Sequence, residues 1–286
     1  MKKQKRLSIK IITLFPQFIE GFAESFGIIQ KAIQGKLLDI KPIDLRAFGL
    51  GERQIVDDRP YGGGVGMVLR ADVMLAAINF ARRGRSLLRQ GSGGQARPAR
   101  TRQKVIMLTP QGKRFEQKDA QRLAKYDNLI FVCGRYEGFD ERIRSYVDEE
   151  LSIGDYVLMG GELPALVISE AVMRLRPGIL GKLESTDKES FSEAMLEYPQ
   201  YTKPEVLTIK IQEPRSKLGA SRGRSRPART EDGRSKILRV PKVLLSGNHQ
   251  KVEEFRREEA LKRTKKRRPD LLKNDKNDMN AKITKN

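Results

Sequence analysis

Three glycine-containing loops hold the residue types that could build a small-molecule site. They are LTPQG at Leu108–Gly112, CGRYEG at Cys133–Gly138 and SIGDYVLMGG at Ser152–Gly161. Glycine allows a ligand to come close to backbone amides and carbonyls, and none of the three loops contains lysine. Negative charge comes from Glu137, Asp155 and the adjoining Glu162. This chemistry disfavours a phosphate-bearing ligand and favours a cofactor that combines adenosine with a sulfonium cation.

Alternating apolar and amphipathic segments predict the elements that position these loops. Strands are expected at Ile9–Phe15, Leu37–Ile43, Lys104–Thr109, Asn128–Cys133 and Tyr156–Met159. Helices are expected at Gln17–Ile33, Ala71–Ala81, Glu116–Tyr126 and Leu163–Arg176. Such alternation is typical of an α/β fold with a parallel sheet, in which ligands bind at the carboxyl edge of the strands. We therefore expect the three loops to meet at that edge and form one pocket.

The chain has 286 residues and, with 57 Lys plus Arg against 36 Asp plus Glu, a formal net charge of +21. Such a charge favours a polyanionic partner, most simply RNA, because each neutralised phosphate releases counterions. The sequence has no recognisable secretory signal and no apolar run of membrane length, so a cytoplasmic protein without membrane contact is expected. One cysteine, Cys133, and one histidine, His249, disfavour a disulfide, a zinc site or a Cys–His nucleophile.

After Gly181 strand signals become rare, and the segments Phe191–Glu197 and Gln250–Lys266 predict a second, smaller helical domain. The predicted boundaries are 1–178 for the α/β domain, 179–190 for a linker, 191–273 for the helical domain and 274–286 for a disordered tail. Two Arg-rich insertions, about 82–103 and 213–240, both contain the string RPART. We interpret them as exposed, largely disordered segments, with an RNA-binding role as the alternative.

The most glycine-dense stretch, DDRPYGGGVGM at Asp57–Met67, does not have the spacing of a nucleotide-binding loop. It lacks the Gly-Lys-Ser/Thr ending of a P-loop, and Met67 stands where the third glycine of G-x-G-x-x-G belongs. By itself the stretch predicts a flexible loop as readily as a binding site.

Together, these motifs resemble the bacterial tRNA (guanine-N1)-methyltransferases of the TrmD type, which are SPOUT methyltransferases. The matching strings are LFP at Leu14–Pro16, DDRPYGGG at Asp57–Gly64, PQG at Pro110–Gly112, CGRYEG at Cys133–Gly138, DER at Asp140–Arg142, SIGDYVLMGGELPAL at Ser152–Leu166, YTKPEV at Tyr201–Val206, LLSGNH at Leu244–His249 and RRPDLL at Arg267–Leu272. They run in family order along the chain, and only the two Arg-rich insertions and the tail fall outside the resemblance.

The resemblance implies a SPOUT-type parallel sheet with a deep trefoil knot, followed by a small helical domain that helps to bind tRNA. It also implies a homodimer whose active sites lie at the subunit interface. The implied activity is methyl transfer from S-adenosylmethionine to N1 of guanosine at tRNA position 37, next to the anticodon. The family also has a link to Mg²⁺, although no residue pattern here specifies a metal site. Two alternatives stay open: a SPOUT enzyme with another RNA target, and a catalytically inactive RNA-binding dimer.

By this resemblance, the S-adenosylmethionine pocket corresponds to the three loops. The matching positions are Pro110, Gly112, Gly134, Tyr136, Glu137, Ser152, Ile153, Gly154, Tyr156, Leu158, Gly160, Gly161 and Pro164. Backbone groups in the region of Ile153, Tyr156 and Leu158 are expected to recognise the adenine.

The resemblance also assigns catalytic and substrate residues. The family's general base is an Asp before a Ser-Phe pair, and Glu189 of KESF occupies that position, with Asp187 as the rival base. Arg174 matches an arginine that supports guanine O6, whereas the nearby Arg176 has no match and is expected at the surface. Substrate contacts are assigned to Asp57, Asp58 and Arg59, on the guanosine or partner-subunit side, and to Lys265, Arg267 and Arg268, in a basic run suited to tRNA phosphates.

Overall fold

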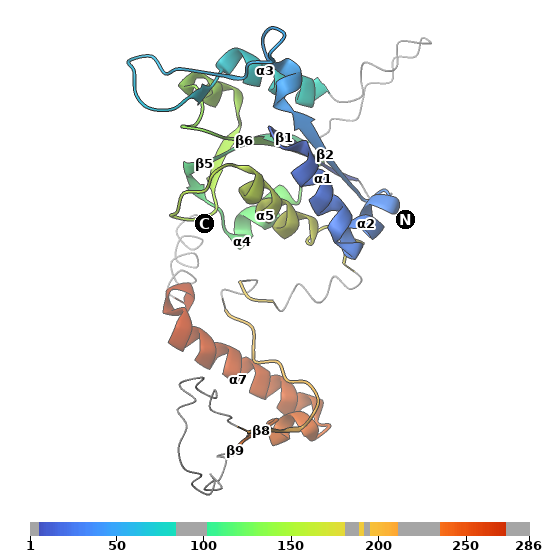
Figure 1. Ribbon diagram of the computed structural model, residues 1–286. Helices are drawn as coiled ribbons and strands as arrows, with labels where there is room; N and C mark the ends of the chain where they lie inside the picture. Colours follow the sequence, from blue (N-terminus) through green and yellow to red (C-terminus); the bar gives the residue numbers. More distant parts are fainter. Residues whose placement is uncertain (1–5, 84–101, 181–188, 192–194, 211–234, 273–286) are drawn as a thin grey trace, which may run out of the picture. The chain divides into compact units, whose positions relative to one another are not determined.

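The computed structural model describes residues 6–83, 102–180, 189–191, 195–210 and 235–272 (Figure 1). The chain divides into two compact units, Met1–Asp187 and Lys188–Asn286, and each is described by itself. Several sequence predictions fall wholly or largely outside the described residues, namely those for the two Arg-rich insertions, the linker, the tail and Asp187.

Five parallel strands form the central sheet of the first unit, in the order β2-β1-β6-β5-β7. They are β1 (Leu7–Thr13), β2 (Leu38–Asp44), β5 (Gln103–Arg114), β6 (Asn128–Cys133) and β7 (Glu149–Ser152). β1 and β6 are rich in Ile, Leu and Val, and each pairs with a strand on both sides, as expected for the buried middle of a parallel sheet. The predicted α/β class with a parallel sheet is confirmed.

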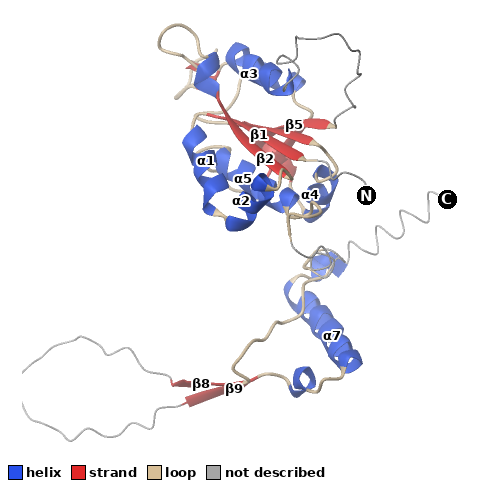
Figure 2. Cartoon of the chain, turned by 90° about the vertical axis from the view of Figure 1, so that its right-hand side faces the viewer, coloured by secondary structure: helices blue, strands red, loops and turns tan. Residues whose placement is uncertain are grey.

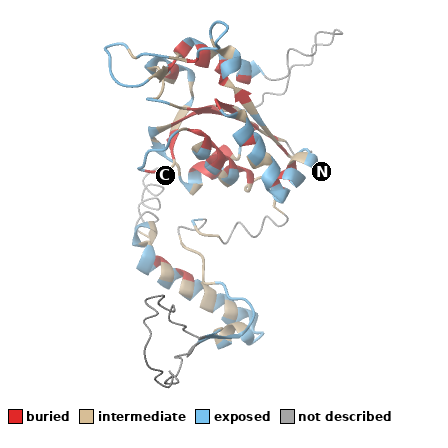
Figure 3. Ribbon diagram, viewed as in Figure 1, coloured by how far each residue is buried: buried red, intermediate tan, exposed pale blue. Residues whose placement is uncertain are grey.

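Helices cover both faces of this sheet, as Figure 2 shows. One face carries α1 (Pro16–Ser25), α2 (Gly27–Gln34), α4 (Gln117–Leu123) and α5 (Glu162–Met173), and the other carries α3 (Ala71–Arg83) with the 3-10 turns η1 (Leu45–Phe48) and η3 (Glu141–Tyr146). Side chains alternate along β1, so that Ile9 and Ile11 join the first core and Ile12 joins the second. Both cores are buried (Figure 3), and they fix the sheet edge from which the loops emerge.

The single helix predicted at Gln17–Ile33 is wrong, because the chain breaks into α1 and α2 at Phe26. The Phe26 backbone is extended, with φ −110° and ψ 115°, and Gly27, a weak helix former, follows it. The Phe26 ring contacts the Phe22 ring, with centroids 5.3 Å apart. Apolar residues occur at helical spacing on both sides of the break, which is why the pattern indicates one continuous helix.

The strand predicted at Tyr156–Met159 is also wrong, since these residues lie in the loop that follows β7 and are all exposed. The strand that precedes this loop is β7, whose sequence EELS does not look apolar. Its two carboxylates are neutralised, because Glu149 pairs with Arg122 at 2.5 Å and Glu150 pairs with Arg144. Ion pairing therefore allows a strand that the hydrophobic pattern does not predict.

The second unit contains the predicted helix at its carboxyl end, but it is not purely helical. α7 (His249–Arg267) agrees with the expected Gln250–Lys266, and the Asn248 side chain caps it by accepting a 3.1 Å hydrogen bond from the Lys251 amide. Before α7 come β8 (Val206–Lys210) and β9 (Ser235–Arg239), which pair antiparallel, and η4 (Lys242–Leu245). The helix predicted at Phe191–Glu197 is wrong for the residues of that segment that the structure describes.

α7 packs against the segment that precedes the β8–β9 ladder. The Thr264 hydroxyl, which is buried, accepts a hydrogen bond of 2.9 Å from the Leu196 amide. Arg256 lies over the Tyr198 ring, 4.8 Å from its centroid. α7 is strongly polar, and none of the helices in the described ranges is both long and apolar enough to cross a membrane.

Candidate active site

A cleft of about 360 Å³ lies at the carboxyl edge of the sheet, where β5, β6 and β7 end. A volume of this size is typical of small-molecule sites. Every predicted cofactor residue except Gly112 lines it, namely Pro110, Gly134, Tyr136, Glu137, Ser152, Ile153, Gly154, Tyr156, Leu158, Gly160, Gly161 and Pro164. Within the described part of the chain, no lysine belongs to this lining. The three loops therefore meet at one edge of the sheet and form one cleft.

The first loop is a bulge within β5. The pairing of β5 with β7 shifts register between Leu108 and Lys113, so the intervening residues leave the ladder. Gly112 lies where the two strands touch, because a Cβ atom added there would come within 2.6 Å of the Leu151 amide nitrogen. Gly112 thus allows close strand packing and lies outside the cleft lining.

The third loop is held at both ends by short contacts that require glycine. The Gly161 amide donates to the Gly134 carbonyl over 3.0 Å, and a Cβ atom at Gly161 would lie 2.7 Å from the Cys133 Cα atom. At the other end, the Ser152 hydroxyl donates to the Gly154 carbonyl over 3.0 Å and accepts from the Gly154 amide over 3.2 Å. Gly154 has a φ of 154°, a value that L side chains rarely adopt. Loop backbone is thereby presented to the cleft.

Arg135, which the sequence analysis did not single out, lines the cleft and pairs with a buried carboxylate. Glu162, the first residue of α5, is 2% exposed, and its Oε2 atom lies 2.9 Å from the Arg135 Nη2 atom. The other carboxylate oxygen accepts a 2.7 Å hydrogen bond from the Thr13 hydroxyl at the end of β1. Arg135 also donates to the Met159 carbonyl over 3.2 Å. A carboxylate in an otherwise apolar helix start is the sequence signal that could have indicated this pair.

The glycine-rich stretch forms a loop between two short antiparallel strands, β3 (Asp57–Asp58) and β4 (Val68–Leu69). Four of its glycines have positive φ values: Gly62, Gly63, Gly64 and Gly66. The Glu137 amide donates to the Met67 carbonyl over 3.0 Å, and a Cβ atom at Gly66 would lie 2.5 Å from the Glu137 Cγ atom. The loop therefore adjoins the cleft through Glu137.

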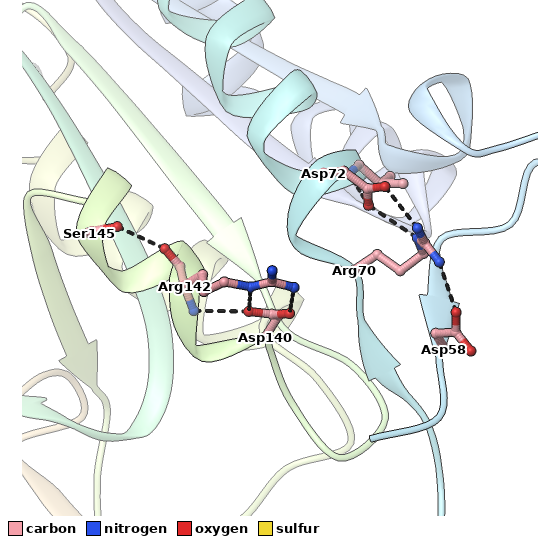
Figure 4. A network of polar contacts seen from close by, with 7 residues as sticks. Asp58, Arg70, Asp72, Asp140, Arg142 and Ser145 are labelled. Atoms are coloured by element: carbon pink, nitrogen blue, oxygen red, sulfur yellow. Dashed lines mark hydrogen bonds and ion pairs between the residues drawn. The ribbon is translucent and has the colours of Figure 1, made fainter. Parts of the chain in front are cut away.

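Two arginine–aspartate clusters lie near this loop (Figure 4). Arg70 donates to Asp58 over 2.8 Å and to Asp72 over 3.1 and 2.8 Å. Arg142 donates to Asp140 over 2.9 and 2.6 Å, and this hydrogen bonding holds the pKa of the Asp140 carboxyl below its usual range. The carboxylate of Asp58, a predicted substrate residue, is therefore fixed by Arg70.

Arg174 and Arg176 follow the last turn of α5, at the other end of that helix from the cleft. α5 has 12 residues and is therefore about 18 Å long. Arg174, which follows it, does not belong to the cleft lining. The predicted surface position of Arg176 is wrong, since this residue is half-buried and donates to the Ala124 carbonyl over 2.8 Å. Burial also lowers the pKa of Arg176.

The predicted base, Glu189, belongs to the second unit, so the geometry of the cleft in the first unit does not include it. Its side chain is half-buried, and the neighbouring Ser190 hydroxyl accepts a 3.0 Å hydrogen bond from the Glu197 amide. In the first unit, Asp57 is half-buried and Arg59 is exposed.

The predicted tRNA-binding residues lie at the carboxyl end of α7. Lys265 and Arg267 are exposed in its last turn. Arg268, the residue after the helix, pairs with Asp270 at 2.7 Å. The structure therefore gathers this basic run at one helix end.

The geometry does not support a Cys–His nucleophile or a metal site at Cys133. Cys133 is buried at the end of β6, where burial and the nearby Glu162 carboxylate raise the pKa of its thiol well above the ordinary value. His249 lies in the second unit, at the start of α7. Among the described residues, no group of three or more His, Cys, Asp or Glu is arranged to hold a metal ion.

Comparison with known proteins places the chain in one family. The model of the family tRNA (Guanine-1)-methyltransferase TrmD matches residues 7–223 and 224–274. A tRNA (guanine-N(1)-)-methyltransferase from Symbiobacterium thermophilum is 44% identical over 265 residues, which cover 92% of this chain and 91% of the relative. Proteins of the same name are 42% identical over 262 residues in Thermus thermophilus, with 92% and 90% covered, and 40% identical over 269 residues in Listeria innocua, with 94% and 93% covered. The chain belongs to the tRNA (guanine-1)-methyltransferase family TrmD.

Proposed function

We propose that the protein transfers a methyl group from S-adenosylmethionine to N1 of the guanosine at tRNA position 37, next to the anticodon. The observation that carries the proposal is the cleft, whose lining includes all three loops that match the family's cofactor motifs. Membership of a methyltransferase family that acts on tRNA supports the reaction class and implies a methyl donor.

The cleft suits S-adenosylmethionine because its lining combines accessible backbone with negative charge. Its glycines allow close approach, and the backbone near Ile153, Tyr156 and Leu158 would recognise the adenine. Glu137 would offer its carboxylate to the positive sulfonium. When bound, this cofactor supplies an electrophilic methyl group attached to sulfur. The two arginines of the described lining, Arg135 and Arg144, are paired with carboxylates, which leaves phosphate groups little attraction.

The acceptor nitrogen needs a base, because N1 of guanine carries a proton at neutral pH. Glu189 would take this proton while N1 displaces the sulfur from the methyl carbon in line, so that S-adenosylhomocysteine and N1-methylguanosine leave. Arg174 would stabilise the negative charge that spreads to guanine O6 during attack. Asp187 is the rival base.

The position of Arg174 supports a homodimer with shared active sites. Arg174 lies ten residues, or about 15 Å along the helix axis, beyond Pro164 of the cleft lining, farther than an arginine side chain reaches. An Arg174 from a second copy, with Asp57, Asp58 and Arg59 on the substrate side, would complete the site.

The proposed architecture also includes a trefoil knot and a linker at 179–190, near the division of the chain between Asp187 and Lys188.

Mg²⁺ has no step in this proposal, because the described residues contain no carboxylate cluster suited to hold it. Of the alternatives, a different RNA target would leave the cofactor chemistry intact. The inactive RNA-binding dimer rests on the replacement of the family's usual Asp by Glu189.

Charge reversal at Lys265 and Arg267 is expected to weaken tRNA binding without changing cofactor binding. Both residues are exposed at the end of α7, where phosphates can reach them. Each lost phosphate contact lowers the salt slope of binding by about 1, so tRNA affinity of the Lys265→Glu/Arg267→Glu variant should fall at least about tenfold at ~0.1 M salt. Fluorescence anisotropy measures tRNA binding, and calorimetry measures binding of S-adenosylhomocysteine. ATP is the negative control in the calorimetry, because we expect it not to bind.

The matched control is Lys31→Glu/Lys125→Glu, which changes the net charge equally at two exposed lysines of the first unit. This control should retain most of the tRNA affinity. Equal affinities for the wild type and the α7 variant would contradict a tRNA-binding role for this helix end.

A further inference from the structure

Arg135 is fixed between a buried carboxylate and the backbone of the third loop. Its Nε atom donates to Glu162 over 3.0 Å, and its Nη1 atom donates to the Met159 carbonyl. The Phe15 ring lies against the guanidinium, 4.3 Å from its Cζ atom. Thr13 contacts both partners, since its hydroxyl donates to Glu162 and accepts from the Phe15 amide over 2.9 Å. The guanidinium is therefore held in one plane.

The loop rests directly on this guanidinium. A Cβ atom added at Gly160 would lie 2.3 Å from the Arg135 Nε atom, so the loop backbone and the side chain are in close contact. Val157 and Met159 of this loop belong to the cleft lining and are 83% and 91% exposed. Hydrogen bonds hold the two loop ends, whereas Arg135 contacts the stretch between them.

We propose that Arg135, fixed by Glu162, Thr13 and Phe15, is a positioning residue that sets the shape of the cofactor-facing loop Ser152–Gly161. This inference rests on the proposed function, because the loop matters only if it binds the methyl donor. It also assigns a role to the LFP string, whose Phe15 supports the guanidinium. Because Arg135 acts on the loop, its loss should weaken donor binding and leave the chemical step at saturating donor nearly intact.

The test separates the contact with the loop from the buried charge. Arg135→Met alone would leave the Glu162 carboxylate buried and unpaired, which risks unfolding. The double variant Arg135→Met/Glu162→Gln removes both charges, and the amide oxygen that it introduces can still accept the hydrogen bond from Thr13. We expect its melting temperature to stay near that of the wild type. Its affinity for S-adenosylhomocysteine should fall about tenfold, as for loss of a charged hydrogen bond, and KM for the donor should rise while kcat stays within about twofold.

A second variant keeps the test decisive if the double variant does not fold. Gly160→Ala retains every charge but pushes the Arg135 guanidinium away from the loop, and it should show the same loss of affinity. Arg135→Lys keeps the pairing with Glu162 and should recover stability but only part of the affinity, because Lys cannot hold the fork geometry.

The control is Arg122→Met, which breaks another pair with a buried carboxylate. Arg122 lies 3.1 Å from Asp119, which is 2% exposed, and it does not line the cleft. This variant should lose stability but bind S-adenosylhomocysteine like the wild type. If both the double variant and Gly160→Ala bind S-adenosylhomocysteine with wild-type affinity, the inference about Arg135 is overturned but the proposed function is not. Failure of the wild type to bind S-adenosylhomocysteine would overturn the proposed function, and the inference with it.

Discussion

Replacement of Glu189 by Gln is expected to lower kcat for methyl transfer by about 10²- to 10⁴-fold, the range typical of loss of a general base. The amide has nearly the same size as the carboxylate but cannot take the N1 proton of guanine. Binding of S-adenosylhomocysteine should not change, because Glu189 is not among the residues that line the cleft. Single-turnover rates with saturating tRNA and donor measure the effect.

The control for this prediction is Asp187→Asn, which removes the rival carboxylate two residues earlier. Its kcat should stay within about threefold of the wild type, since a carboxylate off the reaction path contributes little. If Asp187→Asn stops the reaction and Glu189→Gln does not, the base is Asp187. Full activity of both variants would rule out a base in this segment.

Substitution of Gly161 by Ala is the second change with a large expected effect. The added Cβ atom would lie 2.7 Å from the Cys133 Cα atom and 3.0 Å from the Gly134 nitrogen, and neither backbone atom can move freely. Relief of this contact must shift the third loop away from the second. We expect the free energy of unfolding to fall by about 1–3 kcal/mol, as for overpacking of a core, and donor affinity to fall at least about tenfold.

Gly21→Ala is the matched control, because it adds the same atom in open space. Nothing lies within 4 Å of a Cβ atom at Gly21, which is inside α1. Alanine is favoured over glycine within helices by about 1 kcal/mol, so this variant should be as stable as the wild type or more stable, with unchanged binding. Denaturant unfolding measures the stability of both variants, and calorimetry measures their affinity for S-adenosylhomocysteine. If Gly161→Ala keeps the stability and the affinity of the wild type, the two loops are not tightly packed.

The convergence of the three loops could be predicted from the sequence because two physical rules determine it. Apolar runs such as Asn128–Cys133 identify buried strands, and parallel strands place their carboxyl ends at one edge. The fold class follows from the same alternation. The pattern missed β7, whose Glu149 is neutralised by Arg122, 27 positions away, and whose Glu150 is neutralised by Arg144, 6 positions away.

Contacts between distant residues also explain why the site could be predicted only in part. Arg135 and Glu162 are 27 positions apart, and nothing in either string shows that Thr13 completes their cluster. Gly112 is part of a matching string, yet its closest neighbour is the backbone of β7 rather than the cleft. Types and spacing of residues indicate which loops bind, whereas packing decides which residue of each loop faces the ligand.

Methyl transfer to two unmodified tRNA transcripts tests the proposed activity most directly. The transcripts differ only at position 37, which is guanosine in one and adenosine in the other. The purified protein is incubated with labelled S-adenosylmethionine, and label in the RNA is counted. We expect label in the guanosine transcript alone, as N1-methylguanosine. Equal label in both transcripts would contradict the proposed target, and label in neither would contradict catalysis and favour an RNA-binding dimer.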